Sequence, residues 1–89
     1  MSYQVTFTEI ALKNLKTYPA KDQKLILQKI EQCAENPLNM PNVKKLVNFS
    51  PSYRLRAGNY RILFERDDVA KLIDVIDILP RREAYRRRD

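Results

Sequence analysis

The sequence contains no histidine and no tryptophan, and it has a single cysteine and a single glycine. The absence of histidine removes the usual general base at neutral pH and the most common zinc ligand. One cysteine cannot form an intrachain disulfide, and no apolar run is long enough to span a bilayer. The N-terminal MSYQVTF lacks the pattern of a signal peptide. These absences predict a cytoplasmic protein with no membrane partner, no bound metal and no other cofactor.

Positive charge is what the sequence has in excess. It holds 17 Lys and Arg residues against 11 Asp and Glu, which gives a formal net charge of +6. A small basic domain favours a polyanionic partner, such as nucleic acid, a membrane surface or an acidic protein. All the arginines follow residue 53, whereas every lysine except Lys71 precedes residue 46. Because the guanidinium group can bind phosphate through two hydrogen bonds, we expect the arginine-rich half to make the close contacts.

The hydrophobic pattern predicts a single domain over residues 1–89 with an α+β fold. Strands are expected at residues 3–7, 53–57, 60–66 and 69–79, one helix between a Thr8 N-cap and Pro19, and a second helix at residues 20–35. The connecting segment 37–52 is expected to hold a short helical turn near residues 43–47, and residues 81–88 a terminal helix or a basic tail. The order β-α-α-β-β-β(-α) predicts a small antiparallel sheet with the two helices packed on one face.

The stretch YRLRAGNYRILFER, residues 53–66, is typical of a β-hairpin that turns at Gly58 and Asn59. In that register Arg56 faces Arg61, and Arg54 faces Leu63 on the same side of the sheet. The other side shows the apolar residues Tyr53, Leu55, Ala57, Tyr60, Ile62 and Phe64 and is expected to face the core. Like charges directly opposite each other destabilise a sheet by up to about 1 kcal/mol. The arginine side therefore favours an anion site over an ordinary solvated surface.

The C-terminal stretch PRREAYRRRD, residues 80–89, holds a second cluster of arginines around a tyrosine. If the chain turns back over the sheet after Pro80, Arg81 or Arg82 joins the hairpin arginines, and Tyr85 lies at the same surface. Aromatic residues among arginines are typical of surfaces on which bases stack beside bound phosphates. Asp74 and Asp77 are three residues apart in the last strand, so we expect them on opposite faces, which is a poor arrangement for a metal.

Three stretches together resemble the RelE/ParE superfamily of bacterial type II toxins over essentially the whole chain: VTFTEIALKNLKTY, YRLRAGNYRILFE and ILPRREAY. The resemblance implies a fold of the kind predicted above and a cognate antitoxin protein that masks the basic face. It implies contact with operator DNA through the toxin–antitoxin complex alone. The resemblance to RelE-type members implies a metal-independent endoribonuclease that depends on the ribosome. Such an enzyme cleaves mRNA in the ribosomal A site through attack by the ribose 2′-oxygen on the adjacent phosphate.

The same resemblance implies that five residues are catalytic: Arg54, Arg56, Arg61, Arg82 and Tyr85. It implies that Arg61 and Arg82, with Arg81 adjacent, stabilise the charge that develops on the phosphate, and that Tyr85 stacks on or orients the nucleotide. The chain departs from its relatives where they often carry lysine at the first two hairpin positions, and where some branches carry histidine in place of Pro80. Arginine practically cannot release its proton, so the group that accepts the 2′ proton stays open: water or an RNA group are the alternatives.

Two other functions fit the same sequence. The first is a ParE-like inhibitor of DNA gyrase, which would not need Tyr85 or the paired hairpin arginines. The second is a nucleic-acid-binding module without catalysis. The helical lysines are predicted to rest against ribosomal RNA phosphates, although ordinary solubilising charge explains them equally well: Lys13, Lys16, Lys21, Lys24 and Lys29.

Overall fold

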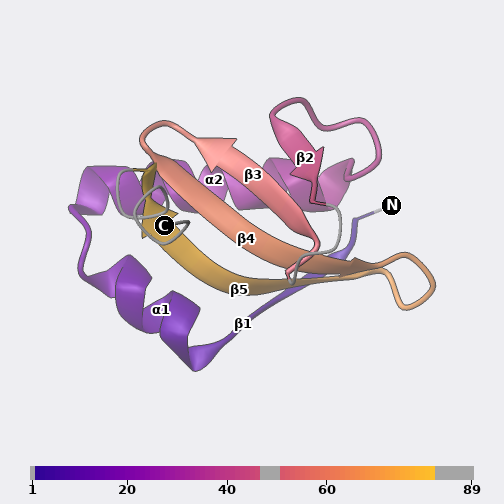
Figure 1. Cartoon of the computed structure of the whole chain (residues 1–89), viewed down its shortest axis with the longest axis horizontal. Helices are drawn as coiled ribbons and strands as arrows, with labels where there is room; N and C mark the ends of the chain where they lie inside the picture. Colours follow the sequence, from indigo (N-terminus) through magenta and orange to yellow (C-terminus); the bar gives the residue numbers. More distant parts are fainter. Residues whose placement is uncertain (1, 47–50, 82–89) are drawn as a thin grey trace.

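The structure is a computed structural model, which describes residues 2–46 and 51–81. Its elements are β1 (Gln4–Phe7), α1 (Glu9–Lys16), α2 (Ala20–Glu35), β2 (Val43–Lys45), β3 (Tyr53–Ala57), β4 (Tyr60–Asp67) and β5 (Leu72–Pro80). The strands form one sheet in the order β1-β5-β4-β3-β2. In Figure 1, α2 crosses behind the sheet and α1 lies beside β5. The predicted α+β fold, with two N-terminal helices packed on a sheet, is confirmed.

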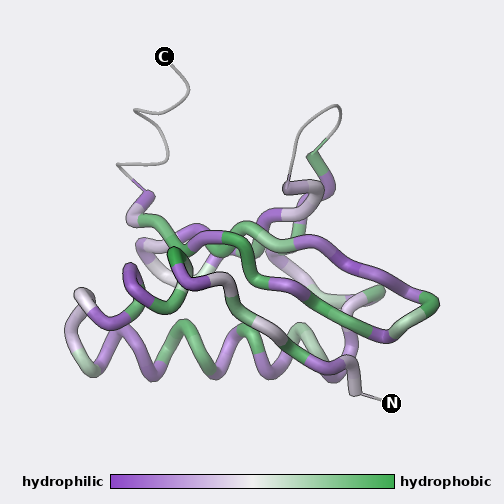
Figure 2. Tube along the Cα trace, turned by 90° about the horizontal axis from the view of Figure 1, so that it is seen from below, coloured by the Kyte–Doolittle hydropathy of each residue, from purple (hydrophilic) through white to green (hydrophobic). Residues whose placement is uncertain are grey.

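Local sequence signals set the helix ends. Thr8 has an extended backbone, and its Oγ1 accepts a hydrogen bond of 3.1 Å from the backbone N–H of Ala11, as an N-cap does. Pro19 precedes α2, and Asn36 leaves the helical conformation at its end. Figure 2 shows the apolar turns of α2 on the side toward the sheet and its polar turns on the outer side. The prediction of this helix at residues 20–35 is confirmed.

The hairpin between β3 and β4 has the predicted register. Arg56 pairs with Arg61, Arg54 pairs with Leu63, and the turn lies at Gly58 and Asn59. Gly58 has φ +60°, a left-handed conformation that costs other residues free energy, and a Cβ there would lie 2.9 Å from Leu25 Cδ2. The turn is therefore pressed against α2, where a residue without a side chain fits best.

Several details of the sheet differ from the expectation. Residues 43–45 form β2, an edge strand antiparallel to β3, where a helical turn was predicted. The pairing of Val43 with Leu55 turns its side chain toward the core, and the ladder to β3 satisfies backbone groups that a single helical turn would leave unpaired. In addition, β1 pairs parallel with β5, so the sheet is mixed and not purely antiparallel.

A β-bulge in β5 overturns the prediction for the two aspartates. Asp77 pairs with Leu63, but Val75 pairs with Phe64, so Ile76 has no partner in β4. The extra residue shifts the alternation of faces by one position. Asp74 pairs with Glu65 and therefore shares a face with Asp77, although the two are three residues apart.

Side chains from the first part of the chain close the edge of β5 where β1 ends. β1 pairs with residues 72–75, which leaves the following carbonyl groups of β5 without a strand partner on that side. The Thr8 hydroxyl donates to Ile76 O and the Tyr18 hydroxyl donates to Ile78 O, each over 2.6 Å. Backbone acceptors at a sheet edge are thus satisfied by side chains instead of by another strand.

The core lies between the sheet and the helices. Its members include Ala11 and Leu15 of α1, Ile26, Ile30, Cys33 and Ala34 of α2, and Leu55, Ile62, Phe64, Ile73, Val75 and Ile78 of the sheet. Leu27 is 43% exposed and Ile10 is 60% exposed, because each helix buries a narrower stripe than its apolar content suggests. None of the helices in the described residues is long and apolar enough to cross a membrane.

Candidate active site

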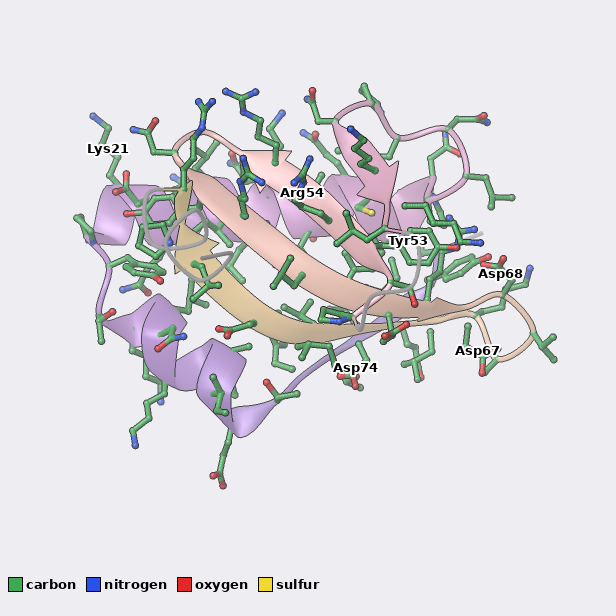
Figure 3. The ribbon with its side chains drawn as sticks, in the orientation of Figure 1. Lys21, Tyr53, Arg54, Asp67, Asp68 and Asp74 are labelled. Carbon is green, nitrogen blue, oxygen red and sulfur yellow. The ribbon has the colours of Figure 1, made fainter. Side chains whose placement is uncertain are left out.

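The hairpin arginines lie on the face of the sheet that is turned away from α2. Figure 3 shows Arg54 on this face, with α2 behind the strands. The strand register places Arg56 and Arg61 on the same face, because each is separated from Arg54 or Leu63 by two positions along its strand. The three arginines that the sequence predicted to lie together are brought together. Arg56 is exposed, whereas Arg54 and Arg61 are half-buried.

These arginines border a depression of about 290 Å³, which we call the cationic pocket. It is lined by Asn42, Val43, Lys44, Arg54, Arg56 and Arg61. Within residues 2–46 and 51–81, Lys44, Arg54 and Arg56 form no ion pair with a carboxylate. Several cations in one concave surface, without an internal counter-ion for most of them, form a site that an anion can neutralise.

Lys44 is the cation of the pocket that the sequence did not predict. It pairs with Arg54 across the β2–β3 ladder, so its side chain belongs to the arginine face. The ladder continues to Asn42, whose carbonyl accepts a hydrogen bond of 3.1 Å from Arg56 N and whose backbone has φ 70°. The signal in the sequence was the single valine before two lysines, too short a pattern to separate a strand from a helical turn.

The hairpin turn is held in place by two residues of the helical layer. The Tyr60 hydroxyl donates a hydrogen bond of 2.7 Å to Asp22 Oδ2 on α2. The rings of Tyr18 and Tyr60 have centroids 4.6 Å apart. Because Tyr60 directly precedes Arg61, these contacts fix the end of β4 from which that arginine projects.

Burial, reinforced by the hydrogen bond to Asp22 and the charge of that carboxylate, raises the pKa of Tyr60 from 10.0 to about 12. Tyr60 therefore ionises first in the unfolded chain, so we expect its contribution to the free energy of unfolding to be complete below about pH 10 and to be lost between about pH 10 and 12. Tyr60→Phe should flatten that alkaline fall and should cost about 1 kcal/mol at pH 7, where it removes the hydrogen bond. Urea unfolding of both proteins across this pH range measures the difference, and equal slopes would contradict the assignment.

Arg81 lies next to the hairpin turn. Its backbone N–H donates a hydrogen bond of 2.8 Å to Asn59 O, and the preceding Pro80 pairs with Tyr60. Residue 81 is exposed and follows β5 at the end of the sheet that carries Arg61. Arg82 and Tyr85, which the sequence also predicted for the site, lie outside the described residues. Their roles therefore stay predictions.

Arg66, the last arginine of the hairpin, has a structural role. Its Nε lies 2.8 Å from Asp68 Oδ1, and its guanidinium lies 4.5 Å from the centre of the Tyr53 ring. A hydrogen bond from the Tyr3 hydroxyl to Asp68 extends this contact and helps to hold the pKa of that carboxyl below its usual range. Arg66 thus joins the N-terminus, β3 and the β4–β5 turn, and it takes no part in the cationic pocket.

The helical lysines do not lie with the arginines. Lys13 and Lys16 belong to α1, which lies beside β5, and Lys21, Lys24 and Lys29 belong to α2, behind the sheet. None of these lysines lines the cationic pocket. Four of the five are exposed, and Lys29 is half-buried. The contact of these predicted RNA-binding lysines with ribosomal RNA stays a prediction.

Two further possibilities for chemistry find no support in the described part of the chain. Burial raises the pKa of the Cys33 thiol, whose residue is 2% exposed, so it is a poor nucleophile. The described residues contain no group of three or more carboxylate, thiol or imidazole side chains placed to hold a metal ion.

A family model matches residues 5–85, nearly the whole chain. Its description is the ParE toxin of the type II toxin–antitoxin system parDE. This chain is a type II toxin of the RelE/ParE superfamily. A curated relative of this RelE/ParE toxin is Toxin RelE3 of Methanocaldococcus jannaschii, which is 38% identical over 65 residues. That alignment covers 70% of this chain and 74% of the relative.

Solved structures support the assignment of this chain to the RelE/ParE superfamily. The RelE–RelB complex of Pyrococcus horikoshii matches with a TM-score of 0.78 and 25% identity, over 91% of this chain and 97% of the other. The RelB–RelE complex of Methanococcus jannaschii matches with a TM-score of 0.73 and 31% identity, over 92% of this chain and 96% of the other. The toxin therefore has the fold of RelE toxins, and the resemblance predicted from its sequence is confirmed.

Proposed function

We propose that this toxin is a ribosome-dependent endoribonuclease that cleaves mRNA in the A site and so inhibits translation. The observation that carries the proposal is the cationic pocket on the open face of the sheet, where three arginines and Lys44 surround one depression. RelE-type relatives and RelE structures lend it support, since this chain shares their fold. Its place of action would be the cytoplasm, where the ribosomes are.

The proposed reaction is a transfer within the RNA strand. The ribose 2′-oxygen attacks the adjacent phosphorus, the bond to the 5′-oxygen breaks, and a 2′,3′-cyclic phosphate and a free 5′-hydroxyl result. The 2′ proton passes to water, and water returns a proton to the leaving oxygen. Negative charge on the phosphate oxygens grows in the transition state, so cations fixed around the phosphate lower the barrier. No metal or other cofactor is needed for this balance.

The roles we assign follow the position of each residue around the hairpin turn. Arg56 and Arg61 face each other and would hold the scissile phosphate between them. Arg81, at the same end of the sheet, or Arg82 after it, would add a further cation, and Tyr85 would stack on the nucleotide. Because a guanidinium group practically cannot accept the 2′ proton, we assign that task to water and expect slow turnover.

We also propose a cognate antitoxin protein as the partner that masks the basic face. The matched RelE structures of Pyrococcus horikoshii and Methanococcus jannaschii are complexes with RelB. An antitoxin that covers the cationic pocket would have to present carboxylates to its cations or exclude the RNA sterically. Contact with operator DNA would then arise through the toxin–antitoxin complex alone.

Programmed ribosomes carrying a defined mRNA test the proposal. With saturating toxin we expect cleavage at a fixed position within the A-site codon and no cleavage of the same RNA without ribosomes. Intact message at saturating toxin would contradict the proposal.

A second candidate is inhibition of DNA gyrase, because the matched family model is that of ParE toxins. A supercoiling assay with purified gyrase separates the two. Inhibition of supercoiling together with intact message on ribosomes would favour the ParE-like function. Salt-dependent RNA binding without either activity would instead favour a non-catalytic nucleic-acid-binding module.

A further inference from the structure

The cations of the pocket are arranged in two rows that run across the strands. The turn row consists of Arg56 and Arg61, which pair directly across β3 and β4. The outer row consists of Lys44 and Arg54, which pair directly across β2 and β3. Neighbouring strands lie about 4.8 Å apart, and residues two positions apart along a strand lie about 7 Å apart. Each row is thus a pair of cations, and the rows are about 7 Å from each other.

One phosphate group cannot engage both rows fully. Two cations that project from neighbouring strands about 4.8 Å apart suit the oxygens of a single phosphate. The offset of about 7 Å between rows is comparable with the step between neighbouring phosphates in an extended RNA strand. Lys44 and Arg54 both line the depression, and neither forms an ion pair within the described residues. The outer row therefore has the geometry of a second site for phosphate.

We propose that Lys44 and Arg54 form a subsite for the phosphate next to the scissile one. The inference rests on the proposed function for the scissile site, and it names the polymer that the pocket holds: a single-stranded RNA of at least two consecutive phosphates. Lys44 supplies a flexible point charge and Arg54 supplies a planar fork with two parallel donors. Because both cations lie one row away from the turn row, we assign them binding and strand register, and we assign the chemistry to the turn row.

The rest of the open face defines the direction of the RNA. Beyond Arg54 the outer row continues with Leu63 and then Asp77, and the next row pairs Glu65 with Asp74. Three carboxylates thus occupy the β4–β5 side of the same face, where they repel phosphate. An RNA strand bound at the turn row is therefore directed over β3 and β2, toward Lys44, and away from β5.

Two neighbouring lysines offer a matched test. Lys44 pairs with Arg54 on the open face, whereas Lys45 pairs with Tyr53, whose ring belongs to the core side. Lys44→Ala and Lys45→Ala remove the same charge from adjacent exposed positions. We would measure binding of a short single-stranded RNA with 2′-O-methyl riboses, which cannot be cleaved, by fluorescence anisotropy over a range of salt concentrations.

We expect Lys44→Ala to weaken binding roughly tenfold and to reduce the slope of log K against log salt by about 0.7. Lys45→Ala should change the affinity less than about twofold. Equal effects of the two substitutions would overturn the subsite, and so would a wild-type toxin that does not bind this RNA. Urea unfolding of each variant separates lost binding from lost folding.

A double-mutant cycle tests the two rows. If Lys44 and Arg54 share one phosphate, Lys44→Ala and Arg54→Ala should be strongly non-additive, whereas Lys44→Ala and Arg61→Ala should be nearly additive. Additivity in the first cycle would overturn the shared subsite. The cycle is read in binding, so it is independent of cleavage: intact message on ribosomes with the expected coupling would reject the proposed function and keep the subsite, and cleavage without the coupling would do the reverse.

Discussion

Arg61→Ala is expected to lower the rate of mRNA cleavage on programmed ribosomes by about 100-fold or more. Its guanidinium faces Arg56 at the turn row and belongs to the strand end that Tyr60 and Asp22 fix. Removal of one preorganised donor to a developing oxyanion typically costs a factor of about 100 to 1000 in rate. The fold should survive, since the substitution also removes a like-charge pair and changes the free energy of unfolding by no more than about 1 kcal/mol.

The control is Lys71→Gln, which removes one positive charge from the β4–β5 turn at the other end of the sheet. It should cleave at nearly the wild-type rate under single-turnover conditions. Arg61→Lys keeps the charge but loses the fork, so an intermediate rate is expected. An Arg61→Ala protein that cleaves as fast as the control would exclude Arg61 from the site.

Phe64→Ala is expected to lower the free energy of unfolding by about 3–5 kcal/mol. Phe64 is 1% exposed and is among the largest fully buried side chains of the described residues. Its ring stacks on Tyr53 with centroids 5.4 Å apart, at the place where the bulge of β5 shifts the register. Truncation leaves a cavity between two strands and the helical layer, which the backbone of a paired sheet cannot easily fill.

Val69→Ala is the comparison variant, because Val69 is 94% exposed in the β4–β5 turn. Its free energy of unfolding should stay within about 0.5 kcal/mol of the wild type in urea titrations. A loss of less than about 1 kcal/mol in Phe64→Ala would mean that the core collapses around the cavity or that Phe64 is not central to it.

The hairpin and the second helix could be predicted from the sequence because their signals are local. A two-residue turn fixes the register of the strands it joins, so the facing of Arg56 and Arg61 followed from the position of Gly58 alone. Residues 20–35 combine helical periodicity with a proline before and an asparagine–proline pair after. These signals need no knowledge of the rest of the fold, and they were sufficient to predict three of the four cations that line the pocket.

The remaining features depend on contacts that are distant in sequence. β2 exists because Val43 and Lys44 pair with β3, and three residues have too weak an intrinsic preference to reveal this. The bulge at Ile76 depends on how β5 meets both β4 and the residues around Thr8, so the shared face of Asp74 and Asp77 could not be predicted from their spacing. Lys44 was missed for the first of these reasons.

The facing positions of Arg56 and Arg61 have a consequence for the stability of the unbound toxin. Their positive charges occupy facing positions, and a polyanion bound between them would offset the repulsion. The free toxin is therefore expected to have a lower free energy of unfolding than the toxin with an anion bound at the turn row. Occupied by its target or covered by an acidic inhibitor, it gains resistance to unfolding by simple mass action. The stability of the toxin is therefore expected to rise with the occupancy of its site.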